Sequence, residues 1–321
     1  MNKTSKLLIL AGAVLASLFL FVSIVYNNFV QKSIYEENSQ HLLSTYEQVD
    51  KTFTMFVQHN WNALSDWSNN LQYLDDAENM KTLWYDFARR KDAWQYQDFY
   101  MFNENCDFIT AAGRDGNAPN IQGIFLDMYE TGQPVISSYI ASDSNRRIVF
   151  ALPMDAPYTI NGVTYSGLAV SYNNDVVEKL IAGNIYQGQS DCYILTSDGN
   201  VLLSLEPKTE FLQKISNLFD FLNKYTNMTE TEITDLKKNI KNVSTGSLQC
   251  RYNNKNYYLV YEPTGINDWT IVGIIHDDVV DASMRRIQSI TIVLLLILNG
   301  CIALLLTGFC PDGFQAAHER T

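Results

Sequence analysis

Two long uncharged apolar runs, one near each end of the chain, limit what this sequence can fold into. Residues 7–26 contain no charged side chain, and residues 287–309 are interrupted only by uncharged polar residues. A helix needs about 20 apolar residues to cross a bilayer, and a backbone in lipid must satisfy its own hydrogen bonds. The sequence therefore predicts two transmembrane helices. A cleaved signal peptide is the alternative for the first run, because Lys3 and Lys6 precede it.

We expect the segment between the two runs to lie outside the cytoplasm. Lys3 and Lys6 favour a cytoplasmic N-terminus, whereas Arg285 and Arg286 before the second run favour the opposite orientation. Long loops are translocated largely regardless of their charge, so the N-terminal pair should decide. The prediction is a two-pass protein of the plasma membrane with a large extracytoplasmic domain and a short cytoplasmic tail, residues 310–321.

The charge and the cysteines of the chain exclude some classes of partner. The chain has 23 basic and 35 acidic residues, a formal net charge of −12, and nearly all of these charges lie between the two apolar runs. An acidic surface of this kind argues against nucleic acid as a partner. Cys106, Cys192 and Cys250 lie in the same segment without CxxC spacing, which leaves open one disulfide with a spare thiol or none.

A long helix is predicted to follow the first membrane span, over residues 27–90. Apolar side chains recur mostly every three or four residues from Leu42 to Leu74, and no proline interrupts them before Pro119. This stripe has two possible partners. It can face the core of a globular domain, or it can form a coiled coil in a homodimer, and the two can alternate along the helix.

Strands and turns dominate from residue 94 onward. A hairpin is predicted over residues 99–111, a short helix over 124–129, and further strands over 134–140, 147–154 and 163–172. The dipeptide Asn161-Gly162 is a strong signal for a tight turn between the last two strands.

The same order of elements then returns in the second half. A hairpin with a turn at Asp198-Gly199 is followed by two polar helical segments and three strands, which are expected at residues 246–252, 257–261 and 269–276. Hairpin, helical insert and three antiparallel strands, given twice, predict an internal duplication.

This layout resembles the double Cache sensor domains of bacterial transmembrane receptors. The residues that carry the resemblance are 147–154 (RIVFALPM), 165–172 (YSGLAVSY), 174–177 (NDVV), 192–203 (CYILTSDGNVLL) and 267–273 (NDWTIVG). It implies an α+β fold in which a long N-terminal helix precedes two PAS-like antiparallel-sheet modules, with transmembrane helices on both sides. The expected modules are a membrane-distal one over residues 91–183 and a membrane-proximal one over 184–284.

The resemblance also implies where a ligand would bind. In double Cache receptors the distal module usually holds a small molecule between its sheet and the loop and helix above it. The amino-acid-binding branch carries an Arg-x-Trp-Tyr-like signature and an aspartate near the end of the last strand. This sequence has no such signature between Thr110 and Pro134, and Tyr172 stands about where the aspartate would fall, so sensing of amino acids is in doubt.

The candidate ligand-binding residues are polar or aromatic side chains of the distal module. A small-molecule pocket is typically lined by aromatic side chains with a few convergent polar groups. The candidates are Tyr100, Arg114, Tyr139, Arg147, Asp155 and Tyr172. Each has a simpler explanation: the strand tyrosines can be core residues, Arg114 can pair with Asp115 in a turn, and Arg147 can lie on a solvated strand edge. An arginine in the pocket would indicate an anionic ligand such as a carboxylate.

Enzymatic motifs are lacking in this sequence. His41, His59 and His276 stand far apart, without the paired spacing of a metal site, and there is no Gly-x-Ser-x-Gly or phosphate-binding Gly-Lys-Ser/Thr sequence. We therefore predict no catalysis, no metal and no cofactor. An anchored hydrolase whose carboxylates converge only in space is the remaining enzymatic alternative.

The sequence-based hypothesis is thus a sensor that binds a small molecule outside the cell, most simply as a homodimer. Receptors of this kind normally continue into a diguanylate cyclase, a histidine kinase or a chemotaxis-type helical bundle. Because only residues 310–321 follow the second apolar run, we expect a truncated product or a separate output partner. The alternative function is a membrane-anchored surface or envelope-assembly protein without a small-molecule ligand.

Overall fold

The computed structural model describes residues 3–71, 95–118, 121–141, 143–182, 185–204 and 215–280, together with residues 82, 85, 89–91, 289–294, 297 and 300. The predicted tail and most of the predicted second membrane helix lie outside the described residues. The chain divides into one unit over residues 43–276 and another over residues 1–42 and 277–321.

No helix within the described part of the chain combines the length and the apolar character that a membrane span requires.

One helix, α1 (Lys3–Leu71), begins the chain, and its C-terminal part is built into the globular unit. Its buried apolar side chains in this unit are Tyr46, Val49, Phe53, Val57, Leu64 and Leu71. Between them the exposed positions are mostly polar, among them Gln48, Gln58 and Asn62. The apolar stripe over residues 43–71 therefore faces the core of its own chain, which decides between the two alternatives for this part of the helix.

The distal module is a six-stranded antiparallel sheet in the order β3-β2-β1-β6-β5-β4. Its elements are β1 (Asp98–Phe102), β2 (Asp107–Thr110), β3 (Asp115–Asn117), α3 (Gln122–Thr131), β4 (Val135–Ile140), β5 (Arg146–Ile160) and β6 (Val163–Asn173). Asn161 and Gly162, with φ values of 51° and 80°, make the predicted turn between β5 and β6. Both central residues at positive φ are what a type I′ hairpin turn requires.

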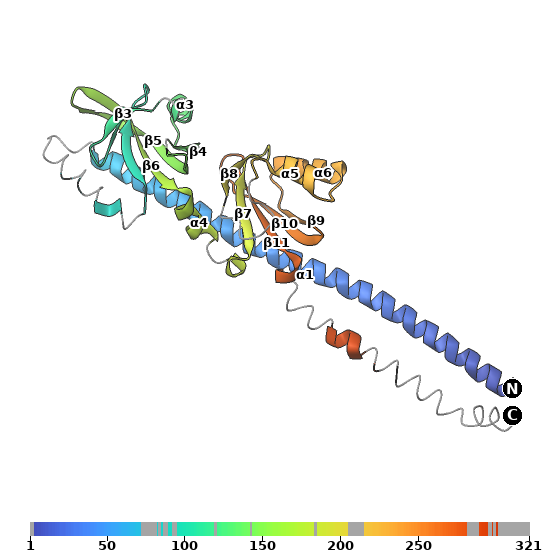
Figure 1. The fold of residues 1–321 in the computed structure, drawn as a ribbon. Coiled ribbons are helices and arrows are strands. Elements are labelled where there is room, and N and C mark those ends of the chain that lie inside the picture. The colour runs from blue at the N-terminus through green and yellow to red at the C-terminus, as the bar shows by residue number, and fades with distance from the viewer. Residues whose placement is uncertain are drawn as a thin grey trace. The chain divides into compact units, whose positions relative to one another are not determined.

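Different helices cover the two faces of this sheet. The helix α3 lies on one face (Figure 1). Its residues Phe125 and Met128 pack in one buried cluster with Phe102, Val149 and Ala169 of the strands. The opposite face receives α1, where the ring of Phe56 meets the rings of Phe150 and Tyr172 edge-on, at centroid distances of 5.4 Å and 5.2 Å. The sheet thus lies between two helical layers.

The proximal module repeats this plan with five strands in the order β8-β7-β11-β10-β9. It follows α4 (Asn174–Ala182) and the short 3-10 helix η2 (Ile185–Gly188), and consists of β7 (Ser190–Leu195), β8 (Val201–Ser204), α5 (Leu218–Tyr225), α6 (Glu230–Lys241), β9 (Gly246–Tyr252), β10 (Lys255–Pro263) and β11 (Thr270–His276). Leu222 of α5 and Leu236 of α6 pack with Tyr257, Leu259 and Val272 on one face of the sheet.

The two sheets have the same topology, which confirms the predicted duplication. In each, the first hairpin pairs with the last strand, and the remaining strands follow in reverse order. The distal sheet differs by β3, which extends the edge beyond β2 and was not predicted. Its sequence, Asp-Gly-Asn, consists of residue types that are depleted in strands. The expected fold class of a long helix followed by two antiparallel sheets is confirmed.

Candidate functional site

Strand alternation places three of the candidate residues, together with Asp98, on one face of the distal sheet. Tyr139 lies directly opposite Arg147 in the β4–β5 pair. Ser171 of β6 pairs with Asp98 of β1 on one side and with Val149 of β5 on the other. Val149 stands two residues after Arg147 and so lies on the same face as Arg147. Since successive side chains of a strand point to opposite faces, Asp98, Tyr100, Tyr139 and Arg147 all lie on the face that α3 covers.

A pocket of about 440 Å³ opens on this face. Its lining comes from β1, β2, β3, the loops that follow β2 and β3, β4, the residue after β4, and β5: Asp98, Tyr100, Phe108, Thr110, Arg114, Asp115, Asn117, Ala118, Ile121, Tyr139, Ala141 and Arg147. A volume of several hundred Å³ is typical of small-molecule sites. The pocket thus brings together Tyr100, Arg114, Tyr139 and Arg147 from the sequence-based candidates.

An ion-pair network links the charged side chains of the pocket. Asp98 accepts from Arg114 Nη2 at 2.7 Å through Oδ1 and from Arg147 Nη1 at 3.2 Å through Oδ2. Arg147 also donates from Nη2 to Asp143 Oδ2 at 2.7 Å. Each arginine therefore already has a carboxylate partner, and Arg147 bridges the carboxylates of Asp98 and Asp143. Among the lining residues, Arg114 and Arg147 balance the charges of Asp98 and Asp115.

Arg147 is part of the pocket wall and not of a solvated strand edge. Its side chain is 13% exposed, against 68% for that of Arg114. Asp143, its second partner, stays ionised, because hydrogen bonds from the backbone N–H of Asn145 and from the Arg147 guanidinium lower the pKa of its carboxyl group. A nearly buried guanidinium held by two carboxylates has little freedom to move, so it presents a defined surface to the pocket.

Tyr100 gives the pocket a buried hydroxyl. The side chain is buried, and its hydroxyl makes no well-aligned hydrogen bond to a described residue. Burial first, and then the neighbouring Tyr139, raise the pKa of Tyr100 well above that of a free tyrosine. It is therefore a neutral phenol that can donate or accept. Because this hydroxyl interacts with Tyr139 but makes no well-aligned hydrogen bond within the described part of the chain, it is a natural contact for a bound molecule.

The other two candidates do not line this pocket. Tyr172 pairs with Ile148 on the α1 side of the sheet, and its hydroxyl donates to Asn60 Oδ1 of α1 at 2.8 Å. Asp155 is exposed and lies within the irregular stretch of β5 between Pro153 and Tyr158, where the register with β6 shifts. The sequence predicted the strand that carries Tyr172 but ended the preceding strand at residue 154, just before Asp155, and it did not predict the faces to which these side chains point.

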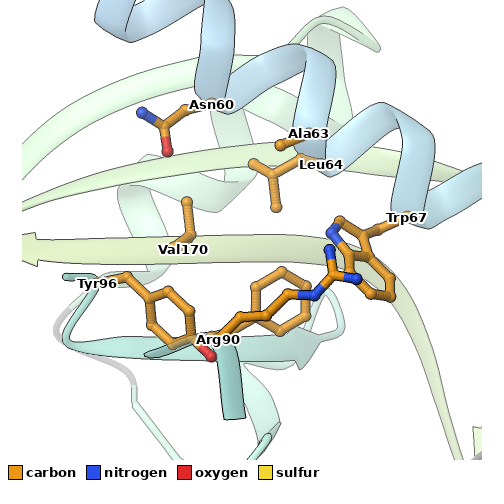
Figure 2. A pocket seen from close by; sticks show the side chains of 8 residues that line it. Asn60, Ala63, Leu64, Trp67, Arg90, Tyr96 and Val170 are labelled. Atoms are coloured by element: carbon orange, nitrogen blue, oxygen red, sulfur yellow. The ribbon is translucent and has the colours of Figure 1, made fainter. Parts of the chain in front are cut away.

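A smaller hollow lies on the α1 side of the same sheet. It is lined by Asn60, Ala63, Leu64 and Trp67 of α1, by Phe99 and Val170 of the strands, and by Arg90 and Tyr96 (Figure 2). The Arg90 guanidinium lies over the Trp67 ring, 5.5 Å from its centroid. Its volume of about 20 Å³ has room for a single water molecule, so it is a packing gap and not a ligand site.

The sequence reasoning missed Asp98, which joins both arginines of the pocket. A signal was available, because Asp98 stands two residues before Tyr100 in one strand and must share its face. Thr110 and Phe108 were also missed. A signal was available for them too, because they pair with Tyr100 and Phe102 across the hairpin and therefore lie on the same face. The open question of the cysteines is also answered: Cys106, Cys192 and Cys250 are buried free thiols.

No protein-family model matches the chain, and no curated protein matches it by sequence.

Solved structures do match. The sensory domain of the Campylobacter jejuni chemoreceptor Tlp3 with isoleucine bound aligns with 79% of this chain and 98% of its own, at 11% identity and a TM-score of 0.52. The ligand-binding domain of the Pseudomonas aeruginosa amino-acid chemoreceptor PctB, in complex with L-Arg, aligns with 78% and 92%, at 13% identity and a TM-score of 0.56.

A third match is the ligand-binding domain of the Pseudomonas aeruginosa chemoreceptor PctC in complex with GABA. It covers 74% of this chain and 99% of its own, at 11% identity and a TM-score of 0.50. Identities this low compare the folds alone. The long helix and the two sheets of equal topology therefore give this chain the fold of the double Cache sensory domains of bacterial chemoreceptors.

Proposed function

We propose that this protein is the sensor region of a bacterial receptor, which binds a small molecule in the distal pocket and passes the event toward the membrane. The observation that carries the proposal is the pocket of about 440 Å³ in the distal module, with its ion-paired arginines and the buried hydroxyl of Tyr100. A filled distal core would have favoured an assembly protein. The neighbours of the same fold are sensory ligand-binding domains, which further supports sensing without catalysis.

The lining favours a small polar ligand that is neutral overall or carries both signs of charge. Arg114 and Arg147 are balanced by Asp98 and Asp115. An anionic ligand at Arg114 or Arg147 would share the guanidinium with Asp98, and a cationic one at Asp98 would share the carboxylate with the arginines. A zwitterion can do both at once, and a neutral polyhydroxyl compound needs to do neither. Amino acids, GABA, carboxylates, amines, purines and sugars are therefore the panel to test.

The arrangement around the pocket is also part of the proposal. We propose two membrane helices, over residues 7–26 and 287–309, a position of residues 27–286 outside the cytoplasm, and assembly as a homodimer. The output would come from a cyclase, kinase or chemotaxis-type partner. Protease treatment of intact cells tests the topology. Cleavage within residues 90–280 is expected for a correctly inserted protein, and complete protection would contradict an extracytoplasmic domain.

A thermal-shift screen of the purified full chain tests the sensing function. A ligand present at 100 times its dissociation constant stabilises the native state by about 2.7 kcal/mol, which corresponds to a shift of a few degrees for a domain of this size. The shift is expected to disappear in Arg147→Gln and to weaken in Tyr100→Phe. Tyr172→Phe is the matched control, because that hydroxyl is bonded to Asn60 on the other face of the sheet.

The outcomes separate sensing from its alternatives. A hit that Arg147→Gln abolishes and Tyr172→Phe retains supports ligand binding in the distal pocket. A hit that survives Arg147→Gln would place the ligand elsewhere in the protein. A folded sample that responds to no member of the panel would favour the assembly alternative.

A further inference from the structure

Two adjacent residues of β5 form the wall of the pocket and a contact between the two modules. Arg147 lines the distal pocket, whereas its neighbour Arg146 donates from Nη1 to the backbone carbonyls of Val201 at 2.9 Å and Leu202 at 3.1 Å. Both carbonyls belong to β8, the edge strand of the proximal sheet. The Arg146 side chain thus reaches across to the other module, while the adjacent side chain on the same strand faces the pocket.

A second contact to β8 starts from the neighbouring strand. Asn173, the last residue of β6, pairs with Arg147, and the next residue, Asn174, donates from Nδ2 to the carbonyl of Ser204 at 2.7 Å. The ends of β5 and β6 therefore carry the same arrangement. At each end, one strand residue faces the pocket side of the distal sheet, and the adjacent residue, Arg146 of β5 or Asn174 at the start of α4, holds the edge strand of the proximal sheet.

Ion pairs and a hydrogen bond fix the residues of β5 and β6 that face the pocket side of the distal sheet. Asp98 and Asp143 hold the Arg147 guanidinium, and Asn173 donates from Nδ2 to Gln97 Oε1 at 3.0 Å. A ligand that competes for Asp98 or Arg147 changes the forces on the first residues of β5. Arg146 is covalently attached to Arg147 in the same strand, so the contact with β8 begins one residue away from the pocket wall.

We propose that Arg146, supported by Asn174, is the residue that couples the distal pocket to the proximal module. This inference rests on the proposed sensing function and adds to it the route of the signal between the modules. Arg146 acts through its grip on β8 and is a positioning residue, not a ligand contact. The chemistry suits the role, because one guanidinium can donate to two successive carbonyl oxygens of an edge strand.

A double-mutant cycle tests the coupling without a ligand. Asp98→Asn perturbs the pocket by removing the carboxylate that joins Arg114 and Arg147, and hydrogen exchange in the peptide over residues 196–204 reports on β8. In the full chain with Arg146 present, Asp98→Asn is expected to accelerate exchange in this peptide about fivefold or more, a factor typical of coupled sites. In an Arg146→Gln background the same substitution is expected to have no further effect on β8.

A matched contact serves as the control. Asn267 donates from Nδ2 to the carbonyl of Ile136 at 3.2 Å, so it also joins the two modules, but Asn267 and Ile136 do not line the pocket. In an Asn267→Ala background the effect of Asp98→Asn on β8 is expected to persist. Arg146→Lys keeps a donor that can reach one carbonyl, so it should retain part of the coupling. This variant is also the fallback in case Arg146→Gln does not fold.

Two results would overturn the inference. One is that Asp98→Asn leaves the exchange of β8 unchanged in the otherwise native chain. The other is that it accelerates exchange by the same factor with and without Arg146. The ligand screen and this cycle fail independently. If no ligand is found but the cycle shows coupling, the sensing function is contradicted and the coupling through Arg146 stands. If a ligand is found but the cycle shows no coupling, sensing stands and the coupling is contradicted.

Discussion

The ring of Tyr46, on α1, occupies the space directly over Gly273, on β11. Tyr46 is fully buried, and a Cβ atom built onto Gly273 would overlap the ring and the hydroxyl of Tyr46. The glycine is required here by close approach and not by its backbone angles, since Gly273 is not among the residues with positive φ. This contact, together with the stacking of Phe53 on Trp269 at 6.3 Å, holds α1 against the proximal sheet.

Gly273→Ala is therefore expected to destabilise the protein. The added methyl group must displace a buried aromatic ring, which costs about 3 kcal/mol of unfolding free energy at the upper end of overpacking effects. Chemical denaturation of the full chain measures the change. Gly123→Ala is the control, because a Cβ there meets nothing within 4 Å and alanine favours the helix α3. A loss no larger than that of the control would contradict the contact.

Tyr172→Phe is expected to lower the unfolding free energy without affecting ligand binding. The substitution removes the hydrogen bond to Asn60 Oδ1, which is buried at the α1 interface. Loss of a buried hydrogen bond that leaves its acceptor unpaired costs about 1–2 kcal/mol. Urea denaturation measures the cost, and the thermal-shift screen measures binding. A loss of binding with native stability would instead bring Tyr172 into the ligand site.

The contribution of Asp50 to the unfolding free energy is expected to be larger at acid than at neutral pH. Burial, and next the Glu262 carboxylate, raise the pKa of Asp50 to about 6, and one oxygen of each group is buried without a hydrogen-bond partner among the described residues. Glu47 acts in the same direction, whereas Thr54 and Lys51 oppose it. The folded state therefore binds the proton more tightly than the unfolded chain. Stability from this group is complete below about pH 4 and is lost as the pH rises to about 6.

Asp50→Asn tests the sign of this effect. The neutral amide removes the repulsion, so the variant is expected to be more stable than the native chain at pH 8, by about 1 kcal/mol because solvent screens a half-exposed group. At pH 4 the advantage should vanish. Thermal denaturation at the two pH values measures it, with Asp66→Asn, an exposed position on the same helix, as the control. An equal gain at both values would show that charge is not the cause.

Thr229 is expected to stabilise α6 through its capping box. Its Oγ1 accepts from the backbone N–H of Glu232 at 3.3 Å, and Glu232 Oε2 accepts from the backbone N–H of Thr229 at 2.7 Å. Thr229→Ala should therefore cost about 1 kcal/mol. Thr234→Ala, within the same helix and exposed, is the control and should be neutral or slightly stabilising, since alanine is the better helix former. Equal effects of the two substitutions would argue against the cap.

Local signals predicted most of the fold correctly. The turn at Asn161 and Gly162 gave the β5–β6 hairpin, and the recurring order of hairpin, helices and three strands gave the duplication that both sheets show. These features follow from residue types within a few positions of one another, so a single sequence contains them. β3 was missed because glycine, aspartate and asparagine form a strand there only by pairing with β2.

The candidate site was predicted only in part. Tyr100, Arg114, Tyr139 and Arg147 meet in one pocket, but Tyr172 faces α1 and Asp155 lies outside the pocket. Alternation along one strand says which residues share a face, yet it does not say which face carries the pocket. That depends on the helix that covers each side, and α1 takes the Tyr172 side because its apolar stripe packs there.

The sequence by itself determined most of the elements within residues 43–276 and their order, because helix periodicity, strand composition and turn residues act over short distances along the chain. Only the tertiary structure decided that the stripe of α1 is buried against its own sheets, that Asp98 joins two arginines from β5 and the loop after β2, and that Arg146 holds the edge of the other module. Each of these contacts joins residues far apart in sequence. These contacts depend on the register of the strands and on which helix packs on which face of a sheet. A local sequence pattern predicts neither the register nor the packing.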